Sequence, residues 1–116
     1  METIPYDKRS GKIWFNGKTV DWTKASVHVL NHGLHYASCV FEGERVYDGE
    51  IFKLEEHTDR LFYSAKRMGI SIPYTKKELN EACKQIVNIQ KVKNGYVRPV
   101  IWRGSEMMAI SAQKNK

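Results

Sequence analysis

With 116 residues, the chain is long enough for one small domain and too short for a second large one. Hydrophobic residues make up 41% of it, and no apolar run reaches the roughly 20 residues that span a bilayer, which argues against a membrane protein. The net charge of +6 suits either nucleic acid or small anions, but the lysines are scattered along the chain, which argues against nucleic-acid binding.

The N-terminus and the two cysteines bear on location. Residues 1–12 are polar, without an apolar stretch of signal-peptide length, so we expect a flexible segment and a cytoplasmic protein. Cys39 and Cys83 lie far apart and form no CxxC pair, which predicts reduced thiols.

The first half of the chain predicts two β-hairpins. Residues 13–15 and 18–20 flank an Asn-Gly pair, and residues 39–47 and 50–53 flank an Asp-Gly pair. Both pairs are typical of tight hairpin turns. Between the hairpins, a short helical or irregular segment is expected to begin at residues 31–33.

Two amphipathic helices follow. Apolar residues recur at helical spacing over residues 54–68, and Gly69 is a typical C-terminal stop. Thr75 with Glu78 forms a capping-box pattern, which predicts the start of a second helix that extends to residue 89 or 90.

The last predicted strand covers residues 96–103, and Pro99 within it favours an edge or a bulge. Strands, then helices, then a returning strand indicate an α+β fold. We expect a small, mostly antiparallel sheet with two main helices packed on it, formed by residues 13–116.

One face of the 39–47 strand carries groups suited to a ligand. Side chains alternate along a strand, so Phe41, Gly43 and Arg45 share one face, and Glu42 and Glu44 lie on the other. A glycine inside a strand is typical of close approach by a ligand or another backbone, and a plain bulge is the alternative.

The 96–103 strand repeats this pattern, because Tyr96 and Arg98 point to the same side. A guanidinium offers a planar fork for a carboxylate or a phosphate, and a phenol adds an oriented donor. We expect the pair to bind a carboxylate. The alternative is a surface arginine paired with Glu42 or Glu44.

Arg60 lies at the border of the apolar face of the first long helix, from where it could reach over the sheet to a phosphate. The plainer alternative is a solvated helix charge paired with Glu56, four residues earlier.

The spacing of His28, His32, His35 and Cys39 resembles a helical metal site. Gly33 interrupts a helix there, so we expect histidines satisfied by backbone groups and a buried, unreactive Cys39.

Four short motifs follow one another along the chain: HGLHY at 32–36, VFEGER at 40–45, EHTDRL at 56–61 and YVRP at 96–99. Their order and spacing resemble branched-chain amino acid aminotransferases, the fold-type IV enzymes that use pyridoxal phosphate. The first two motifs favour this branch over D-amino acid aminotransferases and aminodeoxychorismate lyases.

The resemblance implies a role for each matching residue. Arg60 would hold the cofactor phosphate, and Tyr96 and Arg98 would orient substrate carboxylates. Tyr36, Phe41 and Gly43 would line an apolar pocket, with Arg45 a further member of that face. Ile110 would complete the pocket of a neighbouring subunit, which implies a dimer. The complete enzyme would transfer an amino group between Leu, Ile or Val and 2-oxoglutarate.

The chain departs from the family in two places. Ala37 stands where many members carry glycine. Members also continue into a larger domain with the lysine that forms a Schiff base with pyridoxal phosphate, and no lysine here stands in that motif. We therefore expect a small domain that is inactive alone and binds the cofactor weakly or not at all. The alternatives are a stand-alone, non-catalytic domain for self-association or anion binding and, less favoured, a basic RNA-binding module.

Overall fold

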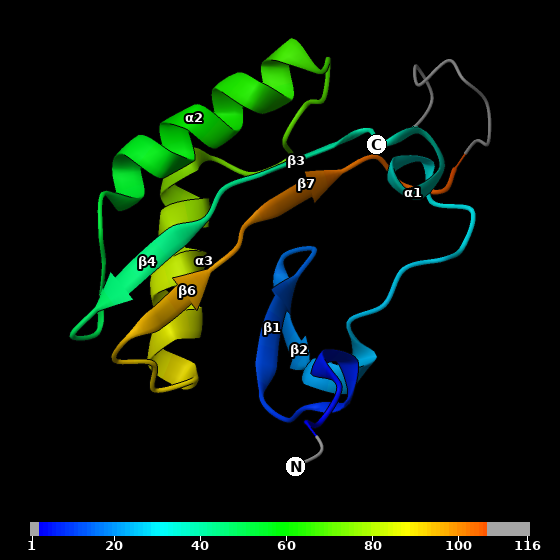
Figure 1. Cartoon of the computed structure of the whole chain (residues 1–116). Helices are drawn as coiled ribbons and strands as arrows, with labels where there is room; N and C mark the ends of the chain where they lie inside the picture. Colours follow the sequence, from blue (N-terminus) through cyan, green and yellow to red (C-terminus); the bar gives the residue numbers. More distant parts are fainter. Residues whose placement is uncertain (1–2, 107–116) are drawn as a thin grey trace.

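The chain folds into short strands and helices in the part that a computed structural model describes, residues 3–106 (Figure 1). Their arrangement confirms the expected α+β fold, and the β1–β2 and β4–β5 pairs confirm the two hairpins. The elements are η1 (Tyr6–Lys8), β1 (Lys12–Phe15), β2 (Lys18–Asp21), η2 (Trp22–Lys24), α1 (His32–Tyr36), β3 (Cys39–Phe41), β4 (Glu44–Tyr47), β5 (Glu50–Ile51), α2 (Leu54–Arg67), α3 (Lys76–Ile89), β6 (Gly95–Val97) and β7 (Val100–Trp102).

A long antiparallel ribbon forms the middle of the fold. β3 pairs with β7, and β4 pairs with β6, so residues 39–47 and 95–102 run side by side (Figure 1). β5 pairs with the other edge of β4. The ribbon therefore joins the segment after α1 to the segment after α3, although they are far apart in the sequence.

Both strands of the ribbon are interrupted at the same level. Glu42 and Gly43 separate β3 from β4, and Arg98 and Pro99 separate β6 from β7. The break at Pro99 agrees with the edge or bulge predicted from this proline, whereas the prediction of one unbroken strand over residues 39–47 is wrong. The physical reason is that Pro99 has no N–H to donate; its carbonyl instead accepts the Glu42 N–H at 3.1 Å.

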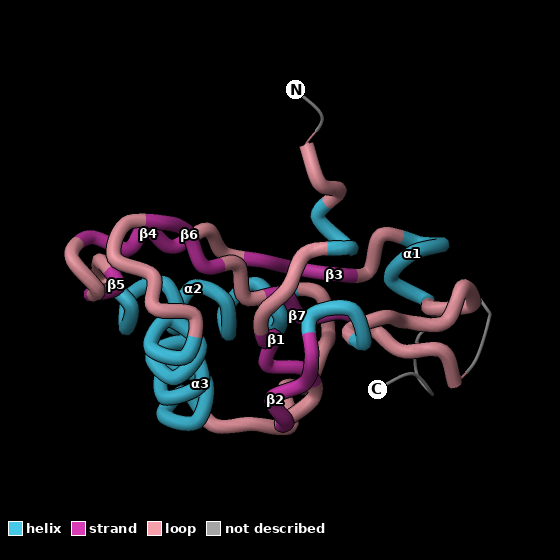
Figure 2. The backbone as a smooth tube through the Cα atoms, turned by 90° about the horizontal axis from the view of Figure 1, so that it is seen from below, coloured by secondary structure: helices cyan, strands magenta, loops and turns pink. Residues whose placement is uncertain are grey.

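Helices α2 and α3 lie on the same side of the ribbon (Figure 2). Thr75 caps α3 as predicted, because its Oγ1 accepts the Glu78 N–H at 3.0 Å. Between residues 3 and 106, no helix is long and apolar enough to cross a membrane. The buried apolar side chains are Val46, Leu54, Leu61, Ala65, Ile70, Leu79, Ala82, Cys83 and Val87.

The β1–β2 hairpin packs beside α3 and β7 (Figure 1). The Trp14 ring lies 5.1 Å from the Tyr74 ring, and the Phe15 ring lies 5.7 Å from the Trp102 ring, centroid to centroid. Before the hairpin, η1 forms a single 3-10 turn against η2. The flexibility expected of residues 1–12 stays a prediction.

Ala37 ends α1 in a left-handed conformation, with φ 57° and ψ 29°. This conformation is strained by about 1–2 kcal/mol for a residue with a Cβ and unstrained for glycine. Ala37→Gly is therefore expected to raise the free energy of unfolding by about 0.5–1 kcal/mol, because the greater freedom of unfolded glycine offsets part of the gain. Urea unfolding followed by circular dichroism measures this change.

The matched control is Ala25→Gly, at a helix end where φ is −84°. That position has no left-handed strain to relieve, so the substitution is expected to lower stability. An equal loss of stability in both variants would contradict a strained turn at Ala37.

Candidate active site

An arginine lies between two aromatic side chains on the exposed side of the ribbon. The Arg98 Nε donates to the Tyr96 Oη at 3.0 Å, and the Arg98 Cζ lies 4.4 Å from the centroid of the Phe41 ring. Both rings are exposed. The hydroxyl fixes one edge of the guanidinium and the Phe41 ring supports its face, which orients the cation.

Arg98 has no carboxylate partner in the described part of the chain. The alternative that it pairs with Glu42 or Glu44 is wrong, since both of these side chains are buried on the other side of the ribbon. An oriented, exposed guanidinium without a counter-ion is suited to a carboxylate from a ligand.

Gly43 makes room for the Tyr96 ring. A Cβ at position 43 would lie 2.6 Å from the Tyr96 Oη and 2.8 Å from its Cε2, so a side chain there would displace the tyrosine. The approach to Gly43 is thus made by a side chain of the neighbouring strand, and not by the ligand or backbone that the sequence pattern predicted. Arg45 stands directly opposite Tyr96 in the β4–β6 register and is exposed on the same face.

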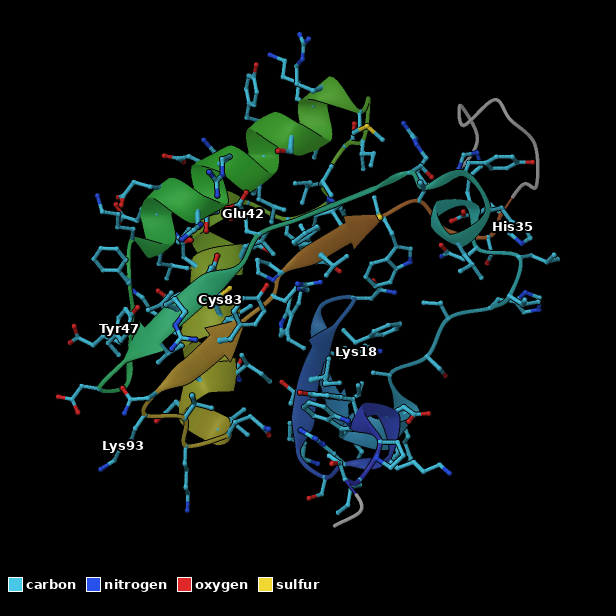
Figure 3. All side chains as sticks on the ribbon, in the orientation of Figure 1. Lys18, His35, Glu42, Tyr47, Cys83 and Lys93 are labelled. Atoms are coloured by element: carbon cyan, nitrogen blue, oxygen red, sulfur yellow. The ribbon has the colours of Figure 1, made fainter. Side chains whose placement is uncertain are left out.

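Arg60 binds Glu42 on the helix side of the strand. Its Nε donates to Oε1 at 3.1 Å and to Oε2 at 2.8 Å, and its Nη2 donates to Oε1 at 2.7 Å. Figure 3 shows Glu42 between its strand and α2. The hydrogen bonds from Arg60 hold the pKa of the Glu42 carboxyl below its usual value, against the opposing effect of burial.

Arg60 therefore pairs with Glu42, and the alternative that it pairs with Glu56 is wrong. Glu42 joins the candidate site, although no role for it was predicted from the sequence. The sequence pattern could have indicated this role, because strand alternation puts Glu42 on the face that the helix covers. A buried carboxylate there needs a cation from that helix.

The remaining candidates lie elsewhere. Tyr36 is in α1, at the opposite end of the ribbon from β4 and β6 (Figure 1), and its ring lies 4.6 Å from the ring of His32. Among the described residues, no hydrogen bond or ring contact joins it to the group of Phe41, Tyr96 and Arg98. Ile110 lies outside the described residues.

Comparisons with known proteins show the family to which the chain belongs. A family model for class IV amino-transferases matches residues 39–116. The chain belongs to the class IV aminotransferase family. It is 46% identical over 108 residues to the branched-chain-amino-acid aminotransferase of Pseudomonas aeruginosa, which covers 90% of the chain and 35% of that protein.

Solved aminotransferase structures have the same fold. The chain superposes on the T.th. branched-chain amino acid aminotransferase with pyridoxamine 5'-phosphate at a TM-score of 0.89 and 38% identity, covering 93% of the chain and 37% of that protein. For the same protein complexed with 4-methylvaleric acid, the TM-score is 0.88 at 38% identity, with coverage of 92% and 37%. The chain thus matches the N-terminal domain of these enzymes and spans a little over a third of their length.

A second buried carboxyl lies next to Glu42 in this aminotransferase domain. Glu44 has 0% exposure, and neither carboxyl oxygen has a hydrogen-bond partner within residues 3–106. Burial raises the pKa of the Glu44 carboxyl. Burial, together with the Glu44 carboxylate nearby, raises the pKa of the Cys83 thiol to about 12 (Figure 3 shows Cys83 on α3). The Cys83 thiol is therefore protonated at pH 7 and unreactive.

Glu44 is expected to make the domain less stable as the pH rises. Its folded-state pKa is above the ordinary 4.5, so its contribution is most favourable below pH 4.5 and is lost as the pH rises through the folded-state pKa. Glu42 has the opposite effect on stability. Because folding lowers its pKa, it contributes stability above its ordinary pKa, and this stability is lost as the pH falls through the folded-state pKa.

The test measures how the free energy of unfolding declines as the pH is raised from 4.5, in the unaltered chain and in two variants. Glu44→Gln is expected to remove part of the decline, and Glu81→Gln, an exposed control on α3, is expected to keep all of it. An unchanged decline in Glu44→Gln would contradict a Glu44 carboxyl whose pKa is raised by folding.

Two of the histidines whose spacing resembles a metal site make hydrogen bonds to the backbone. The His28 Nδ1 accepts the Leu30 N–H at 3.0 Å, and the His35 Nε2 lies 2.7 Å from the Val29 carbonyl oxygen. Across residues 3–106, no three His, Cys, Asp or Glu side chains form a group that could hold a metal ion. Cys39 is exposed, so the expectation that it is buried is wrong.

Proposed function

We propose that the chain forms one wall of the substrate site of a branched-chain aminotransferase. Arg98, held by Tyr96 and Phe41, would bind the carboxylate of the amino acid or the 2-oxo acid. The supporting observation is the oriented guanidinium without a carboxylate partner in the described chain. A relative with 38% identity was crystallised with 4-methylvaleric acid, which joins a carboxylate to a branched apolar chain.

The phosphate of pyridoxal phosphate would bind at Arg60. Its side chain is 65% exposed, and Glu42 occupies only its Nε and Nη2, so the Nη1 donors remain available for an anion. These residues fit a phosphate. The bound cofactor supplies an electron sink for the carbanion formed at the amino acid, and the residues of this chain bind and orient the reactants.

The pocket would be completed by Tyr36, Gly43 and Arg45 of this chain and by Ile110 toward a second subunit of a dimer. Its substrates would be Leu, Ile or Val with 2-oxoglutarate. We propose that the 116-residue chain does not transaminate alone, because it spans only 35% to 37% of its relatives and none of its lysines matches the family's cofactor-binding lysine. The cytoplasmic location stays a prediction.

The test is an NMR titration of the isotope-labelled chain with 4-methylvalerate, with neutral 4-methylvaleramide as the control ligand. The acid is expected to shift the signals of Phe41, Gly43, Tyr96 and Arg98, and the amide to leave them in place. Equal effects of the acid and the amide, or no localised shift, would contradict the proposal. Self-association without ligand binding would favour the non-catalytic alternative.

A further inference from the structure

Glu42 is a charged side chain held in a fixed place. Its side chain is 4% exposed, and the residue lies in the interruption between β3 and β4. Besides the bonds from Arg60, its Oε1 lies 2.7 Å from the Nδ1 of His57, which is one turn earlier on α2. Two residues of α2 therefore meet one carboxylate of the ribbon, which ties the helix to the strand at this point.

The Arg60 side chain, in contrast, would have high conformational entropy if it had no partner. A long side chain that is 65% exposed would sample many rotamers without a partner. The three contacts to Glu42 engage Nε and Nη2 and so fix the plane of the guanidinium. The Nη1 edge is left pointing away from Glu42, because the two sides of a planar guanidinium are rigidly related.

The carboxylate has two opposing effects on an anion bound at Arg60. Its negative charge repels the anion, and its hydrogen bonds hold the guanidinium in one orientation. If charge dominates, removal of the Glu42 charge strengthens anion binding. If orientation dominates, the same change weakens binding, so the sign of the change distinguishes the two effects.

We infer that Glu42, supported by His57, is a positioning residue that holds Arg60 ready for the phosphate of the cofactor. This inference rests on the proposed phosphate-binding role of Arg60. It assigns the buried glutamate of the VFEGER motif to the phosphate site through Arg60, without contact to the substrate.

The experiment measures binding of pyridoxamine 5'-phosphate to the 116-residue chain by NMR, which detects the weak binding expected of this domain. Pyridoxamine is the ligand that lacks phosphate. The amine form cannot condense with surface lysines as an aldehyde would. In Glu42→Gln, the affinity for pyridoxamine 5'-phosphate is expected to fall by about tenfold to a hundredfold, as when a group that orients a ligand-binding side chain is removed at metal sites. Affinity for pyridoxamine is expected to stay unchanged, and the Arg60 Nε–H signal to move to the position of mobile arginines.

Asp59→Asn is the matched charge control. Asp59 precedes Arg60 on α2 and pairs with Lys76 at 3.1 Å, so its removal changes the local charge without releasing Arg60. Its expected effect is unchanged or slightly tighter binding. If Glu42→Gln does not fold, Glu42→Asp takes its place, because the shorter side chain keeps the charge and withdraws the carboxylate from Arg60.

Arg60→Ala separates this inference from the function on which it rests. Weaker binding in both Arg60→Ala and Glu42→Gln supports both. Weaker binding in Arg60→Ala alone, or tighter binding in Glu42→Gln, overturns the positioning role and leaves the phosphate site intact. Unchanged binding in Arg60→Ala overturns the phosphate site itself, and the positioning role with it.

Discussion

Leu61→Ala is expected to lower the free energy of unfolding by about 2–5 kcal/mol, the usual range for a leucine removed from a packed core. Leu61 lies in the middle of α2 with 1% exposure, among the few fully buried side chains of the described residues. A small domain has a total stability of about 5–15 kcal/mol, so this change removes a large share of it. Urea unfolding at constant pH, followed by circular dichroism, gives the loss as a shift of the midpoint.

Leu34→Ala is the control, because it makes the same chemical change in α1 at a side chain that is 64% exposed. Its expected effect is within about 0.5 kcal/mol. Similar losses in the two variants would mean that α2 does not pack on the ribbon as the structure has it.

Arg98→Ala is expected to weaken the binding of 4-methylvalerate by about tenfold to a hundredfold, the usual range for a lost hydrogen bond to a charged group. The change removes the only described guanidinium that both Tyr96 and Phe41 contact. Arg98→Lys keeps the charge but loses the planar fork, so an intermediate affinity is expected. NMR titration measures all three affinities.

Arg67→Ala serves as the charge control for Arg98. Arg67 is exposed in the last turn of α2, and its removal changes the net charge by the same amount. Its expected effect on 4-methylvalerate binding is small, since exposed charges at a distance are screened by salt. Equal weakening in Arg67→Ala and Arg98→Ala would show that only net charge attracts the acid.

Local patterns predicted most of the elements. The capping box at Thr75, the glycine after α2 and the hairpin turns depend on neighbouring residues, so their prediction needed no knowledge of the fold. The same holds for the alternation along residues 39–47, where Phe41 and Arg45 are exposed and Glu42 and Glu44 are buried. These features are short-range, and the structure confirms them.

The interruptions of the ribbon depend on contacts between distant segments. Pro99 breaks the ladder opposite Glu42, and Gly43 is needed because the Tyr96 ring approaches it. The edge or bulge at Pro99 was predicted from the proline itself, but the residues that lie opposite Pro99 and Gly43 cannot be identified from one strand alone. The partner of Arg60 is hidden for the same reason, since the spacing along the helix points to Glu56, whereas Glu42 is 18 residues away and meets Arg60 only after α2 packs on the ribbon.

The candidate site also contains residues whose grouping was predicted and one residue whose position was not. Strand alternation predicted that Tyr96 and Arg98 share one face of their strand, and the resemblance to branched-chain aminotransferases joined them to Phe41. The structure places Arg98 in contact with both aromatic side chains. Neither argument gave a reason to separate Tyr36 from this group, because the position of Tyr36 depends on how α1 folds at the end of the ribbon. The roles of these residues stay predictions until a ligand is bound.

The most direct test of the proposed role is transamination by a chimera. In it, this chain replaces the matching segment of the Pseudomonas aeruginosa branched-chain-amino-acid aminotransferase, with which it shares 46% identity over 108 residues. With pyridoxal phosphate bound, the chimera is expected to transfer the amino group of leucine to 2-oxoglutarate at a rate comparable to the parent enzyme, and to lose most of this activity with Arg98→Ala. A folded chimera that holds the cofactor but does not turn over leucine, or whose activity is unaffected by Arg98→Ala, would contradict it.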